Sequence, residues 1–339
     1  MIGKFTEKAG EAVAIGIKDI ARAAGVSAST VSNVINGRKN VSASVRERVL
    51  AICREMDYQV NPAGKALRTG EPKTILFNFS DFDRQFYLKI IHGISDYVYS
   101  RDYDLIICTS RSCERFMSKS ITTGCIMLDL HCPDDLLIKK ARQNYPIVTL
   151  DRVLEEPYIK NLVVNNYNPM CELVQGLVDR GYRNFAFLSG INTLDNQERF
   201  KGFQDVLEKN HIAFRHERYL LGDFREKSGY QAAKLMLISE SLPQVLVCAN
   251  DNMAIGAIRA FQAEGIRVPQ DIAVTGFDDT AMAEMIGLTT VAIPNYERGY
   301  LAAQYLLENI NGIGNYDTFR IQAKVKWRTT VLPQASHKP

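Results

Sequence analysis

The chain has 339 residues, which is too long for one ordinary core and predicts two or three domains. Hydrophobic residues make up 46% and charged residues 23%, the composition of a soluble globular protein. The net charge of +3 does not by itself indicate nucleic acid, but residues 17–70 carry nine Lys or Arg against four Asp or Glu. This segment is therefore +5 and the remainder −2, the asymmetry typical of a DNA-binding module. A solvated charged face is the alternative.

The seven cysteines are scattered, with no C-x-x-C and no Cys/His spacing typical of zinc. Several lie in apolar runs, where a reduced thiol behaves as a small hydrophobic group and indicates a reducing compartment. The first sixteen residues lack a signal-peptide pattern, and no apolar run reaches the roughly 18–20 residues that span a bilayer. We therefore expect a cytoplasmic protein that is neither exported nor embedded in a membrane.

Residues 15–60 predict a headpiece of three short helices. The first has apolar residues at i, i+3, i+4 and i+7, starting from Ile17, and Gly25 ends it. Ser27 is placed to cap the second helix, because its oxygen can accept a hydrogen bond from the amide of Thr30. Val31 and Ile35 should face inward on that helix. A third helix begins at Ser42 or Ser44, with an inner stripe of Val45, Val49, Ile52, Cys53 and Met56.

Two short helices joined by a glycine turn predict a helix-turn-helix, whose second helix enters the major groove of DNA. The outward face of that helix is small and polar, so its backbone can approach the bases and its hydroxyls can reach phosphates. We expect DNA contacts from Ala28, Ser29, Thr30, Ser32 and Asn33. A generic small helical bundle is the alternative.

Residues 61–72 predict a linker, because Asn-Pro begins the segment and Gly-Glu-Pro ends it. The possible helix between these two breaks is too short to be stable alone.

From Lys73 onward, short β-rich runs alternate with helical runs, which predicts parallel sheets covered by helices. Nine or more candidate strands suggest two sheets. We expect one lobe from residues 73–163 with 294–323 and a second from 164–293 with 324–333. Ligands bind at the carboxyl ends of parallel strands, so a cleft between the lobes is the expected binding site.

Polar and aromatic residues follow several of these strands, where carboxylates, amides and guanidinium groups can bind sugar hydroxyls and a phenyl ring can stack on a sugar. These candidates are Asp151, Arg199, Phe224, Asn250 and Asp278. For each of them a helix cap or a structural ion pair is the alternative, which is the reading we prefer for Asp251 and Asp279.

Motifs of hydrolases, metalloproteases, P-loop enzymes and dinucleotide-binding enzymes are absent from the sequence. Asp151 and Asp278 resemble a glycosidase pair in type only, because nothing in the sequence fixes their separation. We therefore expect no enzymatic activity, no cofactor and no metal.

The segments "IKDIARAAGVSASTVSNVING", "VSASVRERV" and "NPAGKALRTG" resemble the headpiece and hinge of the LacI/GalR (lactose-repressor) family, and the resemblance extends over residues 17–333. It implies a small all-α helix-turn-helix headpiece and an α/β, two-lobed, periplasmic-binding-protein-like core with two parallel sheets. It also implies a hinge helix that folds on operator DNA, with Leu67 wedging a base step and Lys65 beside it. The matching first-lobe contact loop supplies Phe82, Arg84 and Phe86, and the five residues above occupy the positions of effector contacts.

The sequence departs from the family pattern at four positions. Asn33 stands where Arg is frequent, and Asn suits adenine whereas Arg suits guanine. Gly64 replaces alanine in the hinge, where glycine costs up to about 1 kcal/mol in a helix. Ile293 replaces a glutamine, which removes a polar contact. Arg84 replaces asparagine and favours an acidic or phosphorylated effector.

The resemblance implies a dimeric repressor that binds a palindromic operator, and hence the nucleoid. A small molecule in the cleft, a sugar or sugar derivative, would shift the population of lobe arrangements. A carbon-control regulator governed mainly by a protein partner is the alternative. A sugar-transport component is disfavoured by the headpiece and by the lack of a signal peptide.

Overall fold

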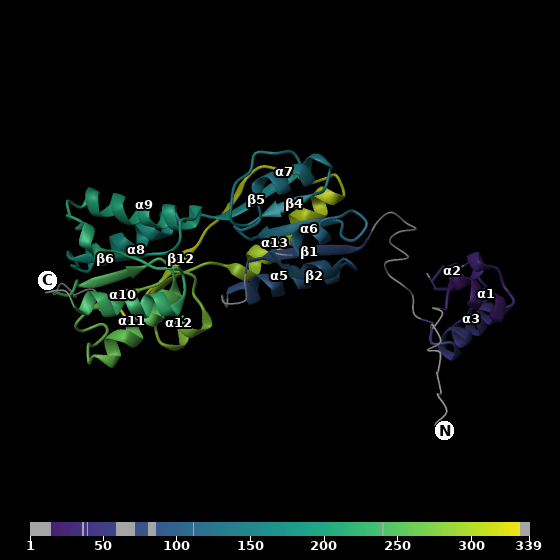
Figure 1. Cartoon of the computed structure of the whole chain (residues 1–339), viewed down its shortest axis with the longest axis horizontal. Helices are drawn as coiled ribbons and strands as arrows, with labels where there is room; N and C mark the ends of the chain where they lie inside the picture. Colours follow the sequence, from purple (N-terminus) through teal and green to yellow (C-terminus); the bar gives the residue numbers. More distant parts are fainter. Residues whose placement is uncertain are drawn as a thin grey trace, which may run out of the picture. The chain divides into compact units, whose positions relative to one another are not determined.

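The computed structural model describes residues 15–35, 37–38, 40–58, 72–80, 86–110, 112–238 and 241–332 (Figure 1). The chain divides into two compact units, Met1–Arg68 and Thr69–Pro339. Four residues with expected functions, Lys65, Leu67, Phe82 and Arg84, lie outside the described residues.

The described residues of the first unit form three helices, α1 (Ile17–Ala24), α2 (Ala28–Ile35) and α3 (Ala43–Glu55). Gly25, with a φ of 63°, turns the chain between α1 and α2 in a left-handed conformation that glycine adopts without strain. Ile20, Val31 and Val49 are fully buried where the three helices meet.

The inward face of α2 is rotated slightly from the predicted one. Val31 is buried as expected, but the second buried residue is Val34, and Ile35 is only half-buried. Positions i+3 and i+4 lie on the same side of a helix, so hydrophobic spacing alone does not decide between them.

The first lobe of the second unit is built on a six-stranded parallel sheet with the order β11-β5-β4-β3-β1-β2. Its strands are β1 (Thr74–Phe79), β2 (Asp104–Thr109), β3 (Gly124–Leu128), β4 (Ile147–Thr149), β5 (Ile159–Val164) and β11 (Phe319–Ile321). Its helices are α5 (Phe86–Ser100), α6 (Cys113–Phe116), α7 (Asp134–Arg142) and α13 (Asn295–Ile310).

Successive residues of β1 point to opposite faces of this sheet, because side chains alternate along a strand. Ile75 and Phe77 pack in the cluster that contains α5 and α13 residues, whereas Leu76 packs with Cys125 and Leu137 on the other face. Both faces are buried, which explains why these strands read as continuous apolar runs.

The second lobe is built on a four-stranded parallel sheet with the order β7-β6-β8-β9. Its strands are β6 (Phe185–Ser189), β7 (Tyr219–Leu221), β8 (Val245–Cys248) and β9 (Ala273–Thr275). Its helices are α8 (Tyr167–Asp179), α9 (Leu194–Lys209), α10 (Glu226–Leu237), α11 (Asp251–Ala263) and α12 (Ala281–Met285), with a 3₁₀ turn, η1 (His216–Arg218). An antiparallel pair, β10 (Thr290–Ala292) and β12 (Lys324–Lys326), completes the lobe, and extended segments connect the two lobes (Figure 1).

Glycines allow α5 and α13 to touch backbone to backbone. A Cβ atom at Gly93 would lie 2.0 Å from the carbonyl oxygen of Tyr296, and one at Gly299 would lie 2.1 Å from that of Ile90. Gly229 and Gly256 join α10 to α11 in the second lobe in the same way. Any larger side chain at these four positions would push the helices apart.

Candidate functional site

The outward face of α2 is the candidate DNA surface. The hydroxyl of Ser27 accepts a hydrogen bond of 3.1 Å from the backbone N–H of Thr30, so the predicted cap is present. The same hydroxyl contacts those of Ser29 and Thr30 at 2.7 and 2.8 Å. Ala28 and Ser29 are exposed, and Asn33 is half-exposed without a side-chain hydrogen bond to the described residues. The amide of Asn33 is therefore available to a base edge.

A cavity lies where the order of strands reverses in both sheets of the second unit. In the first lobe this point lies between β1 and β3, and in the second lobe between β6 and β8. The helices that follow neighbouring strands there lie on opposite faces of the sheet, which opens a crevice at the carboxyl ends of the strands. Residues after β1, β3, β4, β6, β8 and β9 line the cavity.

Six of the eight expected effector contacts line this cavity, and the other two are Phe82 and Arg84. The described lining consists of Ser80, Phe86, Tyr87, Leu128, Leu130, His131, Asp151, Ile191, Thr193, Asp195, Arg199, Phe224, Asn250, Asp278, Ile293 and Arg298. Residues from both lobes contribute, so a ligand here would contact both.

Arg199 is held in the cavity wall by several contacts. Its Nε donates to Oδ1 of Asn166 at 2.9 Å, and its Nη1 donates to the carbonyl oxygen of Ala249 at 2.6 Å. Its Nη2 lies 3.7 Å from Oδ1 of Asp278, and its guanidinium lies 3.8 Å from the ring centroid of Phe277. Arg199 lies in the second turn of α9, not at its start as expected, so the helix itself fixes its position.

Asn250 and Phe224 are held together at the second-lobe side of the cavity. Oδ1 of Asn250 accepts from the backbone N–H of Met253 at 3.0 Å and caps α11, and Nδ2 donates to the carbonyl oxygen of Phe224 at 3.0 Å. Phe224 has a φ of 68°, a strained conformation for this residue type. Asn250 therefore fixes the backbone that presents the Phe224 ring to the cavity.

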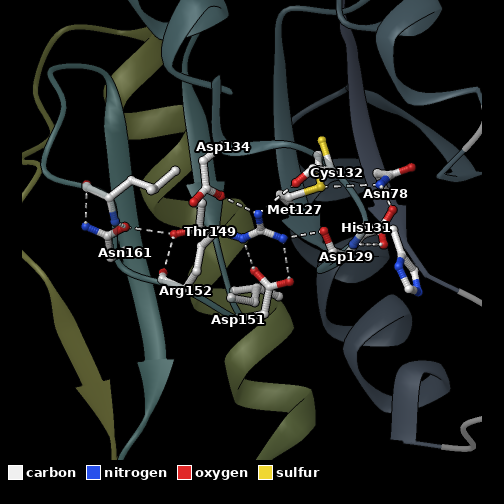
Figure 2. A network of polar contacts seen from close by, with 12 residues as sticks. Asn78, Met127, Asp129, His131, Cys132, Asp134, Thr149, Asp151, Arg152 and Asn161 are labelled. Carbon is white, nitrogen blue, oxygen red and sulfur yellow. Dashed lines mark hydrogen bonds and ion pairs between the residues drawn. The ribbon is translucent and has the colours of Figure 1, made fainter. Parts of the chain in front are cut away.

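Asp151 is held by its neighbour Arg152 at the first-lobe side (Figure 2). Nε and Nη2 of Arg152 donate to the two carboxylate oxygens of Asp151 at 3.1 and 3.2 Å. Nη1 also donates to Asp134, and Nη2 to the carbonyl oxygen of Asp129, so Arg152 joins the loop after β4 to the segment between β3 and the start of α7. Burial nevertheless raises the pKa of the Asp151 carboxyl, because the Arg152 contacts offset only part of the desolvation.

Two charged cavity residues, Asp195 and Arg298, were absent from the sequence predictions. Asp195 lies in the first turn of α9, and its Oδ1 accepts from Nδ2 of Asn166 at 2.8 Å. Arg298 precedes the buried positions Ala302 and Leu306 at helical spacing. A charged residue on an otherwise apolar stripe is the signal that could have revealed Arg298.

Asp251, beside Asn250, is structural as expected. It is fully buried, and its carboxylate accepts from the backbone N–H of Thr280 at 2.8 Å and from the hydroxyl of Thr290 at 2.5 Å. These bonds join α11 to the start of α12 and to β10. Burial raises the pKa of Asp251 to about 6, because desolvation outweighs both hydrogen bonds.

Because the pKa of Asp251 is raised, we expect the free energy of unfolding of the core to fall as the pH rises from about 4 to about 6. The unfolded carboxyl, with a pKa of about 3.9, releases its proton before the folded one does, so folding takes up a proton in this range. A difference of about two pKa units corresponds to about 3 kcal/mol. We expect Asp251→Asn to lack this pH dependence. The free energy of unfolding of the variant minus that of the wild type should therefore increase by about 3 kcal/mol from pH 4 to pH 7.

Denaturant unfolding at several pH values, followed by the fluorescence of Trp327, would measure this difference. Trp327 is the single tryptophan of the chain and packs in the second-lobe core. Parallel pH profiles for the two proteins would show that Asp251 does not titrate in this range.

Two general features of the described residues bear on other classes of site. No group of three or more His, Cys, Asp or Glu in the described part is arranged to hold a metal ion. No helix there is long and apolar enough to cross a membrane.

Both units of the chain match families of known proteins. The model for bacterial regulatory proteins of the lacI family matches residues 16–61, and that for the periplasmic binding protein-like domain matches residues 174–331. The probable HTH-type transcriptional repressor ExuR of Bacillus subtilis is 31% identical over 307 residues, which cover 88% of this chain and 92% of the relative. The ribose operon repressor of Haemophilus influenzae is 28% identical over 93% of this chain and 98% of its own length.

A crystal structure of the lac repressor dimer bound to operator and the anti-inducer ONPF has a TM-score of 0.82 to this chain. It is 27% identical, and the match covers 94% of this chain and 99% of that one. A helix-turn-helix unit followed by a two-lobed α/β core defines the class of bacterial DNA-binding regulators with a periplasmic-binding-protein-like core. The expected fold class is thereby confirmed.

The chain belongs to the lacI family of bacterial regulatory proteins. It is a transcriptional repressor of the LacI type, and the family consists of repressors rather than enzymes.

Proposed function

We propose that this repressor binds a palindromic operator as a dimer and that a small molecule in the inter-lobe cavity, a sugar or sugar derivative, controls its affinity for DNA. The observation that carries the proposal is the cavity itself, whose lining comes from both lobes and combines carboxylates, guanidinium groups, an amide and aromatic rings. Such a set binds hydroxyl groups through hydrogen bonds and sugar faces through ring stacking.

Regulation requires that the ligand bind one lobe arrangement more tightly than another. A ligand held by Asp151 in the first lobe and by Arg199 and Asp278 in the second makes all its contacts only when the lobes adopt one spacing. The dimer follows from the two-fold symmetry of a palindromic site. The seven free cysteines agree with a reducing cytoplasm, where the operator is found.

A paired ligand and operator experiment tests the proposal. Thermal unfolding is followed through Trp327 against a panel of sugars, sugar acids and sugar phosphates, and the operator is selected from randomised duplexes. A ligand at about 100 times its Kd should stabilise the core by about 2.7 kcal/mol and change operator affinity by about 5- to 150-fold. If no compound of the panel changes either property but a co-purifying protein changes operator affinity, regulation by a protein partner replaces the proposal.

A further inference from the structure

Arg298 is a buried cation in the cavity wall whose hydrogen-bonding capacity is not filled. It lies in the first turn of α13 with an exposed fraction of 2%. Nη2 donates to the carbonyl oxygen of Leu150 at 2.5 Å, and Nη1 donates to Oδ1 of Asn295 at 3.5 Å, a long and weak hydrogen bond. Nε is buried and has no hydrogen-bond partner. Most buried polar atoms are satisfied, so an unsatisfied one in a cavity wall points to a missing partner.

The charges of the cavity leave Arg298 without a counter-ion. Asp151 pairs with Arg152 and Asp278 pairs with Arg199, whereas none of the ion pairs between described residues includes Arg298. The carboxylates of Asp195, Asp151 and Asp278 attract it only from beyond ion-pair distance. A buried charge without a close partner is costly, so binding an anion here would recover free energy.

Helix ends add positive potential at the same place. α9 begins beside Thr193, α11 beside Asn250 and α13 at Asn295, and the first two of these caps line the cavity together with Arg298. Each helix has twelve or more residues, and its amino-terminal end carries the positive end of the helix dipole. These dipoles reinforce the preference of Arg298 for an anion.

We propose, on the basis of the function proposed above, that the effector is a sugar acid whose carboxylate binds Arg298. The planar guanidinium matches a carboxylate in a charge-assisted pair, and the aspartates bind the hydroxyl groups of the same ligand. A phosphate monoester is disfavoured, because three carboxylates line the cavity and would repel its second negative charge more strongly.

The test uses full-length protein and matched ligand pairs. A panel of hexuronates and hexonates is compared, by thermal unfolding and calorimetry, with the neutral sugar or polyol of the same stereochemistry and with its 6-phosphate. We expect an acid of the panel to bind at least about 10-fold more tightly than its neutral counterpart. In Arg298→Met this acid should lose about 10- to 100-fold in affinity while the neutral counterpart does not, and Arg298→Lys should lose less than Arg298→Met.

Arg142→Met serves as the control, because Arg142 pairs with Glu156 on the surface and does not line the cavity. The unfolding midpoint and operator affinity of each variant without ligand report whether it folds. Preferred binding of a neutral sugar or a phosphate overturns the proposal, as does an equal loss of acid and neutral sugar in Arg298→Met. If no compound of any class binds, the proposed function itself fails together with this inference.

Discussion

Replacing Arg199 by alanine should weaken effector binding about 100-fold or more and thereby abolish the response, while operator affinity stays within about threefold of wild type. Arg199 lines the cavity and holds Asp278 through the contact of 3.7 Å, so the substitution removes one ligand contact and misplaces another. Hydrogen bonds to charged groups contribute about 1.5–3 kcal/mol each, and two of them account for the expected loss. Operator affinity should persist because the helix-turn-helix belongs to the other compact unit.

The measurements are calorimetric titration with the ligand that the panel selects and fluorescence anisotropy with labelled operator. Arg199→Ala also leaves Asp278 buried without its cation, so a lower unfolding midpoint is expected. Arg199→Lys keeps the charge and should recover part of the affinity. Arg267→Ala removes an exposed arginine paired with Asp271 outside the cavity lining and should change nothing. A normal response in Arg199→Ala would remove this residue from the effector site.

Replacing Val31 by aspartate should abolish specific operator binding, with a loss of more than about 1,000-fold. Val31 is fully buried among the helices of the first unit, whose core contains only six buried apolar residues in its described part. A core of this size supplies about 3–5 kcal/mol, and a buried unpaired carboxylate costs several kcal/mol, so the headpiece should unfold. The second unit should keep its unfolding midpoint and its ligand affinity, because it folds around separate clusters.

Asn33→Ala is the matched control on the same helix. It changes an outward-facing side chain, so the headpiece should stay folded and lose only about 1–3 kcal/mol of discrimination at one base pair. Circular dichroism and selection from randomised operator sites distinguish the two variants. Wild-type operator affinity in a Val31→Asp protein whose headpiece is unfolded would show that the headpiece is not the DNA-binding unit. If the unfolding midpoint of the second unit also falls in Val31→Asp, the two units do not fold independently.

The headpiece was predictable because each of its features is local in the sequence. The turn at Gly25 and the cap at Ser27 depend on residues within three positions of each other, and both are present. The choice between Val34 and Ile35 as the buried residue was not predictable, since it depends on how α2 rotates against α1 and α3.

From residue pattern alone, the cavity was predictable mainly where a residue lies just beyond the carboxyl end of a strand. Asp151 follows β4 and Asn250 follows β8, and the topology of parallel sheets brings such positions together. Their role as effector contacts stays a prediction. Arg298 was missed because it does not follow a strand. It reaches the cavity from the first turn of α13, a helix whose other inward residues are mostly apolar.

The glycine contacts between α5 and α13 have a consequence for the affinity of the cavity. Gly299 follows Arg298 directly, and its backbone lies against that of Ile90 on α5, whose first residues, Phe86 and Tyr87, line the same cavity. Arg298 and the rings of Phe86 and Tyr87 therefore lie on two closely packed helices, which hold their positions before a ligand binds. Preorganised walls lose little conformational entropy when they bind, so the ordering cost of association should come mainly from closing the lobes. Substitutions that loosen the packing of α5 against α13, such as a larger residue at Gly93, should weaken ligand binding without removing a ligand contact.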